Sequence, residues 1–391
     1  MKIGLEKHIE IKKILKGKKV SVVCNISSVD KSLVHVVDVL IGLGARVKSI
    51  MGPQHGFIID KQDNMKESDH VQRNSDYDVP VYSLYGNSRE PQDYMLDDVD
   101  AVVYDLQDVG ARYYTFIYTM AYVMKACARL EKQFIVLDRP NPVNGIDVEG
   151  GVVQKGFESF VGLYPIANRH AMTVGELALM FNKEFGIACN LKIIKMTGWD
   201  RKKYWDDFAS KEGRSWVLPS PNMPTFDTAL VYPGQCLLEA TNVSEGRGTT
   251  KPFEIFGATF IYHKSFLAHK AIKGLKGVVF RPLFFEPTFN KFKGDVCKGF
   301  QIHVTDRNTF DSLKTSLAII YALRNLYPND FFFTPPPYEY EYEKMPIDIL
   351  LGSDRPRKVL EQDCSFNDFC ASVNDGHKNF MKQRNKYLLY K

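Results

Sequence analysis

The stretch from Thr241 to Glu254 holds the densest group of chemically capable side chains in the sequence. It carries Glu245, Arg247 and Glu254 and almost no apolar residue. Glycines on both sides of Arg247 let the backbone take positive φ and approach a ligand closely. The stretch follows an expected strand at Thr228–Leu238, and polar loops at strand ends often carry function. It therefore indicates a site, with a solvated surface turn as the alternative.

Further polar sets stand at the ends of other expected strands. They are Asn25, then Gln54 with His55, then Asp105, Asp108 and Arg112, and finally Asp138, Arg139 and Asn141. In parallel sheets the carboxyl ends of the strands meet at one edge, where ligands gather. A single acid at such an end is often only a helix cap. Several sets in one sheet favour a cleft.

The first half of the chain alternates strands and helices with short connections. Strands are expected at Lys18–Cys24, Arg46–Met51, Val79–Leu84, Val99–Asp105, Gln133–Leu137 and Asn190–Met196. One helix is expected at Lys31–Ile41 after a cap at Asp30, and another ends at about Leu130. A long loop is expected at 60–78. Thr173 and Glu176 have capping-box spacing, which gives Glu176 a structural role. This alternation predicts a parallel, right-handed α/β sheet of Rossmann-like layout.

The second half has a different pattern. Strands are expected at Thr228–Leu238, Gly277–Pro282 and Gly299–Val304, helices near Phe266–Lys273 and Asp311–Tyr327, an extended arm at Phe331–Tyr342 and a last helix within Phe366–Tyr387. Trp216–Thr225 has three prolines, so the domain boundary is expected just after it. We therefore predict a Rossmann-like domain at 1–228, a smaller α+β domain at 229–391, and a cleft between them.

Composition excludes several classes of function. The 391 residues carry a net charge of +5 without a basic run, so no nucleic-acid partner is expected. The seven cysteines lack C-x-x-C spacing, and no G-x-G-x-x-G or Walker fingerprint occurs, so neither a metal nor a cofactor is expected. No apolar run is long enough to span a membrane. The charged N-terminus has no signal-peptide h-region, which predicts a cytoplasmic protein.

Taken together, the motifs resemble one known family. They are Gly-Pro-Gln-His-Gly-Phe from residue 52, Asp-Leu-Gln-Asp-Val-Gly-Ala-Arg from 105, Leu-Asp-Arg-Pro-Asn-Pro from 137, Arg-His-Ala-Met-Thr from 169, Pro-Ser-Pro-Asn-Met-Pro-Thr from 219 and Asn-Val-Ser-Glu-Gly-Arg-Gly-Thr-Thr from 242. The chain is similar over nearly its whole length to the exo-β-N-acetylmuramidases of glycoside hydrolase family 171. The resemblance implies the two-domain fold and release of terminal N-acetylmuramic acid from peptidoglycan fragments. The implied partner is a small sugar or muropeptide, and the oligomeric state stays open.

This sequence departs from the family pattern at three positions. The family has Pro-Glu-His-Gly where this chain has Gln54 before His55, and usually glycine where this chain has Ala171 and Ala240. Glutamine cannot transfer a proton. The protein is therefore either impaired or uses a neighbouring carboxyl group, and Gln54→Glu is expected to raise activity.

Glycoside hydrolysis normally needs two carboxyl groups across the scissile bond. The expected catalytic positions are Gln54, Asp105, Asp108 and Glu245. The expected substrate-binding residues are Asn25, His55, Arg112, Asn141, His170, Glu239, Asn242 and Arg247. Glu239 is also a candidate for one of the two carboxyls, and the substrate's N-acetyl group is a possible nucleophile in place of the second.

The lactyl carboxylate of muramic acid calls for a cation, for which Arg112 and Arg247 are the candidates. Their alternative role is a structural salt bridge in the cleft wall. Three hypotheses stay open for the whole protein: an active exo-muramidase, a sugar-binding protein that has lost catalysis, and a nucleotide-sugar or phosphate-sugar enzyme.

Overall fold

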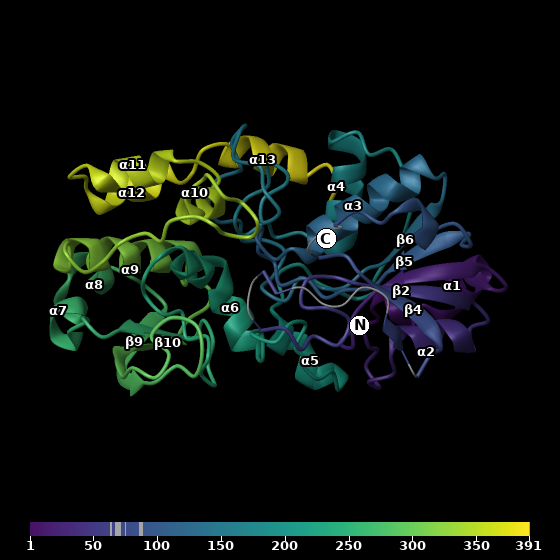
Figure 1. Cartoon of the computed structure of the whole chain (residues 1–391), viewed down its shortest axis with the longest axis horizontal. Coiled ribbons are helices and arrows are strands. Elements are labelled where there is room, and N and C mark those ends of the chain that lie inside the picture. The colour runs from purple at the N-terminus through teal and green to yellow at the C-terminus, as the bar shows by residue number, and fades with distance from the viewer. Residues whose placement is uncertain (63–64, 67–71, 75, 86–88, 391) are drawn as a thin grey trace.

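The protein consists of two parts that lie side by side, each built on its own sheet (Figure 1). The computed structural model describes residues 1–62, 65–66, 72–74, 76–85 and 89–390. Within these ranges the larger sheet comprises β1 (Lys19–Val23), β2 (Arg46–Gly52), β3 (Gln72–Asn74), β4 (Val79–Ser83), β5 (Ala101–Tyr104), β6 (Gln133–Leu137) and β7 (Asn190–Ile194). The smaller sheet comprises β8 (Ile255–Ala258), β9 (Val278–Phe285) and β10 (Cys297–Val304).

The larger sheet has the strand order β3-β4-β2-β1-β5-β6-β7. Every neighbouring pair is parallel except β3 with β4. The central strands β1, β5 and β6 are short apolar runs, as expected for strands buried on both faces. The parallel α/β prediction for the first half is therefore confirmed.

Helices cover both faces of this sheet. Alternate side chains of β5 and β6 enter different cores, since Ala101 and Ile135 belong to one cluster and Val102 and Phe134 to the other. The first cluster includes side chains of α1 (His8–Leu15) and α2 (Val36–Gly42), and the second includes those of α3 (Phe116–Arg129) and α4 (Val174–Glu184). The domain is doubly wound.

The second part is a three-stranded antiparallel sheet with helices around it. The strand order is β8-β10-β9. The remaining α-helices are α5 (Trp205–Glu212), α6 (Phe226–Gln235), α7 (His263–Ala268), α8 (Lys270–Lys273), α9 (Ser312–Leu326), α10 (Pro346–Leu351), α11 (Arg355–Glu361), α12 (Phe366–Ser372) and α13 (His377–Arg384). The 3₁₀ helices are η1 (Gly4–Glu6), η2 (Asp93–Met95) and η3 (Cys236–Ala240).

One core joins the two parts. The cluster beneath α3 and α4 continues through α6 and α9 to the smaller sheet. Helix α6 stands between the two parts in Figure 1 and packs against α9. The proposed boundary between residues 228 and 229 falls inside α6, so the chain crosses from one part to the other through a buried helix.

The strand expected at Thr228–Leu238 is wrong, because this segment forms α6 and η3. Thr225 begins the helix as its N-cap, with its hydroxyl oxygen accepting a hydrogen bond from the Thr228 amide. All residues from 228 to 240 are buried. A segment that is apolar on every side shows no period by which a buried helix differs from a buried strand.

Two other local predictions need correction. Asp30 does not cap a helix: its carboxylate accepts from the amides of Ser32 and Val34, and α2 begins later, with His35 as N-cap. The single last helix expected within Phe366–Tyr387 is two helices, α12 and α13. The loop expected at 60–78 contains the short strand β3 (Gln72–Asn74), and residues 63–64, 67–71 and 75 of it lie outside the described residues.

The end of the chain returns to the first part. The Tyr390 hydroxyl donates to Asp138 at 2.5 Å and accepts from the Met196 amide at 2.9 Å. The Leu389 amide donates to Glu176 at 2.7 Å. Over the described residues, none of the helices combines the length and the apolar character that a membrane span requires.

Candidate active site

A small polar pocket lies where the two parts meet. Its volume is about 30 Å³, room for no more than a few water molecules. Its wall is built from the residues after β2, the segment before α3, the loop before α6, the α6–η3 region and the arm at 331–342. The lining residues are Gln54, His55, Tyr113, Tyr114, Thr115, Phe116, Val161, Ser220, Asn222, Met223, Tyr232, Glu239, Arg247, Phe253, Tyr338 and Glu339.

Glu339 is a carboxyl group that the arm places in this wall, with only 4% of the residue exposed. Its oxygens accept hydrogen bonds from the Gln54 amide at 3.1 Å and the Tyr85 hydroxyl at 2.9 Å. Burial raises the pKa of Glu339 to about 7, and the charge of Glu239 contributes to the rise. Glu339 can therefore carry a proton near neutral pH.

Gln54 is held in one orientation by its partners. Its amide nitrogen donates to Glu339 and, at 3.2 Å, to the Tyr85 hydroxyl. Its amide oxygen accepts from the Thr115 hydroxyl at 2.6 Å. The side chain thus presents N–H groups, not an acid, to the carboxyl of Glu339.

His55 follows Gln54 in a left-handed conformation with φ of 71°. Such backbone strain in a non-glycine residue is concentrated at functional sites. Its Nδ1 lies 2.6 Å from the Lys61 carbonyl oxygen. Since a carbonyl only accepts, Nδ1 carries the proton. Burial lowers the pKa of His55 to about 4, with Arg247 adding to the effect, so the ring is neutral at neutral pH.

Glu239 is the second carboxyl group in the pocket wall. One oxygen accepts from the Arg247 guanidinium at 2.7 Å and the other from the Tyr338 hydroxyl at 2.7 Å. Burial and the charge of Glu239 raise the pKa of Tyr338. The pocket therefore brings together a carboxyl group that tends to be protonated and a carboxylate paired with a cation.

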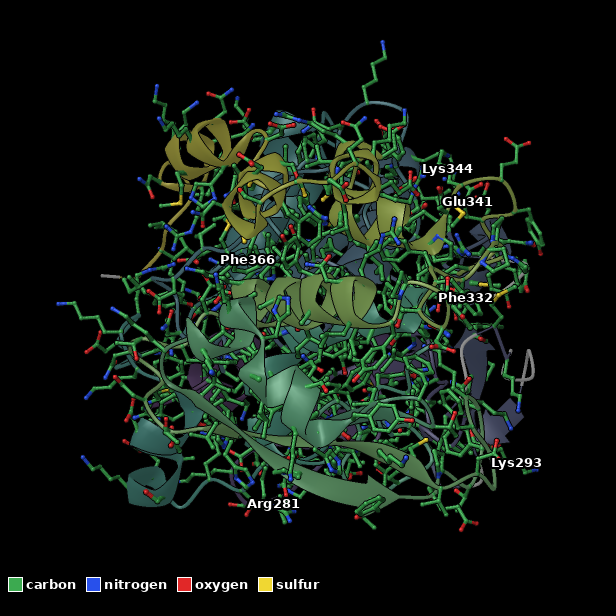
Figure 2. All side chains as sticks on the ribbon, turned by 90° about the vertical axis from the view of Figure 1, so that its left-hand side faces the viewer. Arg281, Lys293, Phe332, Glu341, Lys344 and Phe366 are labelled. Atoms are coloured by element: carbon green, nitrogen blue, oxygen red, sulfur yellow. The ribbon has the colours of Figure 1, made fainter. Side chains whose placement is uncertain are left out.

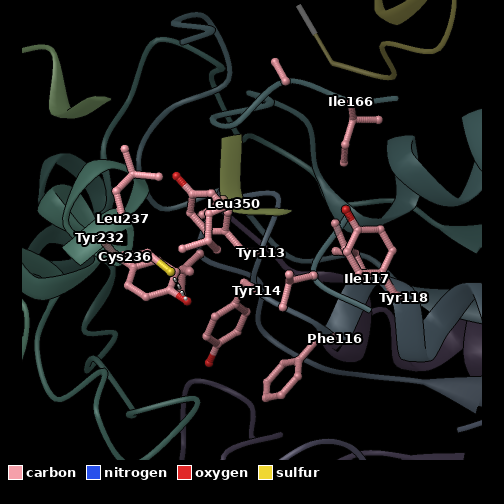
Figure 3. Close-up of a cluster of buried hydrophobic side chains, with 14 of the residues drawn as sticks. Tyr113, Tyr114, Phe116, Ile117, Tyr118, Ile166, Tyr232, Cys236, Leu237 and Leu350 are labelled. Carbon is pink, nitrogen blue, oxygen red and sulfur yellow. Dashed lines mark hydrogen bonds between the residues drawn. The ribbon is translucent and has the colours of Figure 1, made fainter. Parts of the chain in front are cut away.

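Aromatic rings form much of the remaining wall. Tyr113 and Tyr114 come from the segment before α3, Phe116 is the first residue of α3, and Tyr232 faces them from α6 (Figure 3). The Tyr232 ring lies edge-on to Tyr113 and Tyr114, with centroids 6.1 and 6.0 Å away. Rings of this kind suit the apolar faces of a sugar.

Glu245 lies behind the pocket and does not line it. The Lys291 ammonium is 2.9 Å from one of its oxygens, and Arg247 Nε is 3.7 Å from the other. Burial would raise the pKa of Glu245, but Lys291 and then Arg247 hold it below its usual value. Glu245 was expected as a catalytic position, but these contacts are those of a structural partner of Lys291 and Arg247.

The strand-end acids of the larger sheet are engaged with internal partners outside the pocket wall. Asp105 accepts two hydrogen bonds from Arg139, at 2.6 and 2.7 Å. Asp108 accepts from the Gly110 amide at 2.7 Å and lies 3.3 Å from His170 Nε2. The structure places neither aspartate beside Glu239 or Glu339.

Three asparagines expected to bind substrate are hydrogen-bonded to the protein backbone, partly to segments distant in sequence. Asn25 donates to the Pro219 carbonyl, Asn141 to the Met172 carbonyl and Asn242 to the Asp330 carbonyl. Each also accepts from a backbone amide, those of Ser27, Val143 and Phe332 respectively. None of the three lines the pocket.

Arg112 is also absent from the pocket wall. It is fully buried and donates to the carbonyl oxygens of Gly151, Ile166 and Leu350 at 2.7–2.9 Å. It therefore ties α10 to the first part of the molecule. Of the two arginines considered for a substrate carboxylate, the structure brings only Arg247 to the pocket.

The two alanines that replace family glycines lie in different settings. Ala171 has φ of 51°, in the region that favours glycine. Ala240 is fully buried at the end of η3, and its carbonyl accepts from the Thr334 amide at the base of the arm. Only the first departure therefore carries a backbone cost.

Sequence reasoning missed Glu339. The residue lies in Tyr338-Glu339-Tyr340-Glu341-Tyr342, a run that the sequence predicted only as part of an extended arm. The extended conformation expected for this segment does not hold at Glu339, because Glu339 and Tyr340 have φ of 50° and 64° and form a turn closed by the Tyr338–Glu341 bridge. Tyr338 and Glu339 are adjacent in sequence, and both line the pocket.

No cluster of three or more His, Cys, Asp or Glu side chains suited to a metal ion occurs in the part of the chain that the structure describes. The side chains that line the pocket supply two carboxyl groups, a guanidinium, a neutral imidazole, two amides, four phenols and two aliphatic hydroxyls.

The chain is similar to known proteins over most of its length. The N-terminal and C-terminal models of the exo-β-N-acetylmuramidase NamZ match residues 20–227 and 230–390. Peptidoglycan β-N-acetylmuramidase NamZ of Bacillus subtilis is 43% identical over 384 residues, which cover 97% of this chain and 89% of that protein.

Crystal structures of two DUF1343 family proteins from Bacteroides fragilis have the same fold. One has a TM-score of 0.87 at 33% identity and the other 0.77 at 28%, and each match covers 100% of this chain and 99% of the other. Because both family models match in order and together span most of the sequence, this chain belongs to the exo-β-N-acetylmuramidase NamZ family.

Proposed function

We propose that this protein is a glycoside hydrolase that releases terminal N-acetylmuramic acid from peptidoglycan fragments. The observation that carries the proposal is the pair of carboxyl groups in one pocket, Glu339 with its pKa raised to about 7 and Glu239 paired with Arg247. A buried carboxyl group whose pKa is raised suits the role of acid, and a carboxyl group that is hydrogen-bonded to a cation suits the role of base or nucleophile.

Glu339 is the general acid in this proposal. It keeps its proton near neutral pH because it is buried, and the Gln54 amide and Tyr85 hydroxyl fix its orientation. Protonation of the glycosidic oxygen needs such a group. Gln54 then serves as a positioning residue for Glu339. Glu339, on the arm, supplies the carboxyl group that the family has as glutamate at position 54.

Glu239 is the carboxylate that acts as base or nucleophile. Arg247 and the Tyr338 hydroxyl hold its two oxygens, so the group is fixed in orientation. Arg247 also supplies the cation for the lactyl carboxylate of muramic acid. The aromatic wall offers a surface for the apolar face of the ring.

Entry of a sugar ring requires the pocket to widen, since its volume is only about 30 Å³. The arm is the segment best placed to move. The start of the arm is hydrogen-bonded to Asn242 and to the Ala240 carbonyl. Further along, Tyr338 and Glu339 are held to the pocket wall by side-chain hydrogen bonds. Ligand binding should therefore change hydrogen exchange in residues 331–345 more than in β1 or β5.

The test is hydrolysis of a chromogenic β-N-acetylmuramide by the wild-type protein, with the matching β-N-acetylglucosaminide as control substrate. We expect colour release from the muramide and at least about tenfold less from the glucosaminide, because a charged hydrogen bond is worth roughly 1.5–3 kcal/mol. Equal turnover of the two substrates would contradict the assignment of the lactyl group to Arg247.

A second candidate is a muropeptide-binding protein that has lost catalysis. The presence of Gln54 where the family has glutamate favours it. Calorimetry with free N-acetylmuramic acid measures binding, and the chromogenic muramide measures turnover. Binding together with turnover supports the hydrolase, whereas binding without turnover at any pH between about 5 and 8 supports the binding protein.

A further inference from the structure

Lys291 lies on the connection between β9 and β10, far in sequence from the pocket residues. Its Nζ donates to the carbonyl oxygens of Leu238 at 2.8 Å, Val243 at 3.1 Å and Glu239 at 3.3 Å. Its side chain is 19% exposed. A single ammonium group thus fastens the end of η3, which carries Glu239, to the loop that carries Arg247.

The fourth partner of Lys291 is the carboxylate of Glu245, at 2.9 Å. The Glu245 side chain is only 2% exposed. A buried carboxylate needs a paired cation, since an uncompensated buried charge is strongly destabilising. Lys291 is nearer to this carboxylate than Arg247, whose Nε lies 3.7 Å from it.

Arg247 therefore stands between two carboxylates. Its Nη2 is 2.7 Å from Glu239, which lines the pocket, and its Nε is 3.7 Å from Glu245, which lies behind the pocket. The two acids compete for one guanidinium. The attraction of each falls with distance and with any other positive charge beside it.

We propose that Lys291 is a positioning residue that neutralises Glu245 and so keeps Arg247 on Glu239. Without Lys291, Glu245 would be a buried carboxylate with Arg247 as its nearest recorded cation, and the guanidinium would turn away from the pocket. Glu239 would then lose the partner that orients it. The kinetic part of this inference rests on the proposed hydrolase function, but the geometric part does not.

The test is a double-mutant cycle made of Lys291→Met, Glu245→Gln and the two together, with kcat/KM for the chromogenic muramide as the readout. If Lys291 acts by neutralising Glu245, its replacement should cost about tenfold or more when Glu245 is present. It should cost less than about threefold when residue 245 is glutamine, because no charge then draws Arg247 away.

A purely structural role predicts a different result. Loss of the three carbonyl contacts would lower activity equally in both backgrounds, and that outcome overturns the proposal, as does full activity of Lys291→Met alone. Lys293→Met is the matched control, since Lys293 lies two residues further on the same connection and is exposed at the edge of the molecule (Figure 2). It should leave kcat/KM unchanged.

Two further measurements keep the inference testable if a variant folds poorly or the hydrolase function fails. Lys291→Arg keeps the positive charge and should retain a Glu239–Arg247 contact near 2.7 Å in a crystal structure. In a crystal structure of Lys291→Met, Arg247 should lie closer to Glu245 than the present 3.7 Å and further from Glu239. An unchanged Arg247 in that structure overturns the proposal whatever reaction the protein catalyses.

Discussion

Two carboxylate–arginine pairs in this protein have similar geometry but differ in their other hydrogen-bond partners and in their surroundings. The Asp105–Arg139 pair lies at the end of β5. The Glu239–Arg247 pair lies where η3 is followed by the polar stretch Thr241–Glu254. Both pairs are buried and short, at 2.6 and 2.7 Å. Asp105 receives two hydrogen bonds from one guanidinium, whereas Glu239 shares its oxygens between Arg247 and the Tyr338 hydroxyl.

The pairs also differ in their surroundings. Nη2 of Arg139 also donates a hydrogen bond to the Val29 carbonyl. The Asp105–Arg139 pair therefore connects the segments that follow β1, β5 and β6. The Glu239 pair borders a pocket that also contains Glu339. A buried charged pair thus indicates a site where the adjoining cavity also holds a second reactive carboxyl group, as Glu339 does here.

The largest expected effect concerns the general acid. Glu339→Gln keeps the size of the side chain but removes the proton, so kcat/KM for the muramide should fall by about 10²–10⁴-fold. Glu341→Gln is the matched control, because Glu341 lies on the same arm and contacts Lys344 near the molecular edge (Figure 2). Comparable losses in the two variants would remove Glu339 from the acid role.

Asp105→Asn should act on stability instead. It leaves the Arg139 guanidinium buried without its carboxylate, which should lower the free energy of unfolding by about 3–5 kcal/mol. Chemical denaturation measures this loss, with Asp98→Asn as the control, since Asp98 is a surface acid that is 58% exposed. A stable variant with a large drop in kcat would instead place Asp105 in the reaction.

Sugar selectivity should depend on the second pair. Wild type should bind N-acetylmuramic acid about tenfold or more tightly than N-acetylglucosamine, because the lactyl carboxylate gains a charged hydrogen bond from Arg247. Calorimetry of both sugars should find this preference lost in Arg247→Gln. Arg281→Gln, on the outer strand β9, should keep it, and equal loss in both variants would contradict the assignment.

The smallest expected effect is a shift in pH dependence. In wild type, kcat/KM should fall as pH rises through about 7, because Glu339 loses the proton that the reaction needs. Gln54→Glu places a carboxyl group about 3 Å from Glu339, and two such groups share one proton. The alkaline limb should move upward by about one pH unit, and maximal activity should rise. A profile identical to that of wild type would show that the two positions are not coupled in the reaction.

Local features of the first part followed from the sequence. The strand at Gln133–Leu137 and the capping box of Thr173 with Glu176 occur as predicted. The parallel arrangement followed from the alternation of strands and helices. These features depend on residues a few positions apart, so a short window contains their cause.

The sequence by itself thus determined the family, the parallel α/β layout and the presence of acids, amides and arginines in polar loops. Only the tertiary structure decided which of them share a pocket. Gln54 meets Glu339 across 285 positions of sequence, while Arg112 and Asp105, which carry equally suggestive motifs, use their polar atoms on internal partners. The reason is physical: a side chain is available for chemistry only if folding leaves it beside a cavity, and that depends on partners contributed by distant segments of the chain.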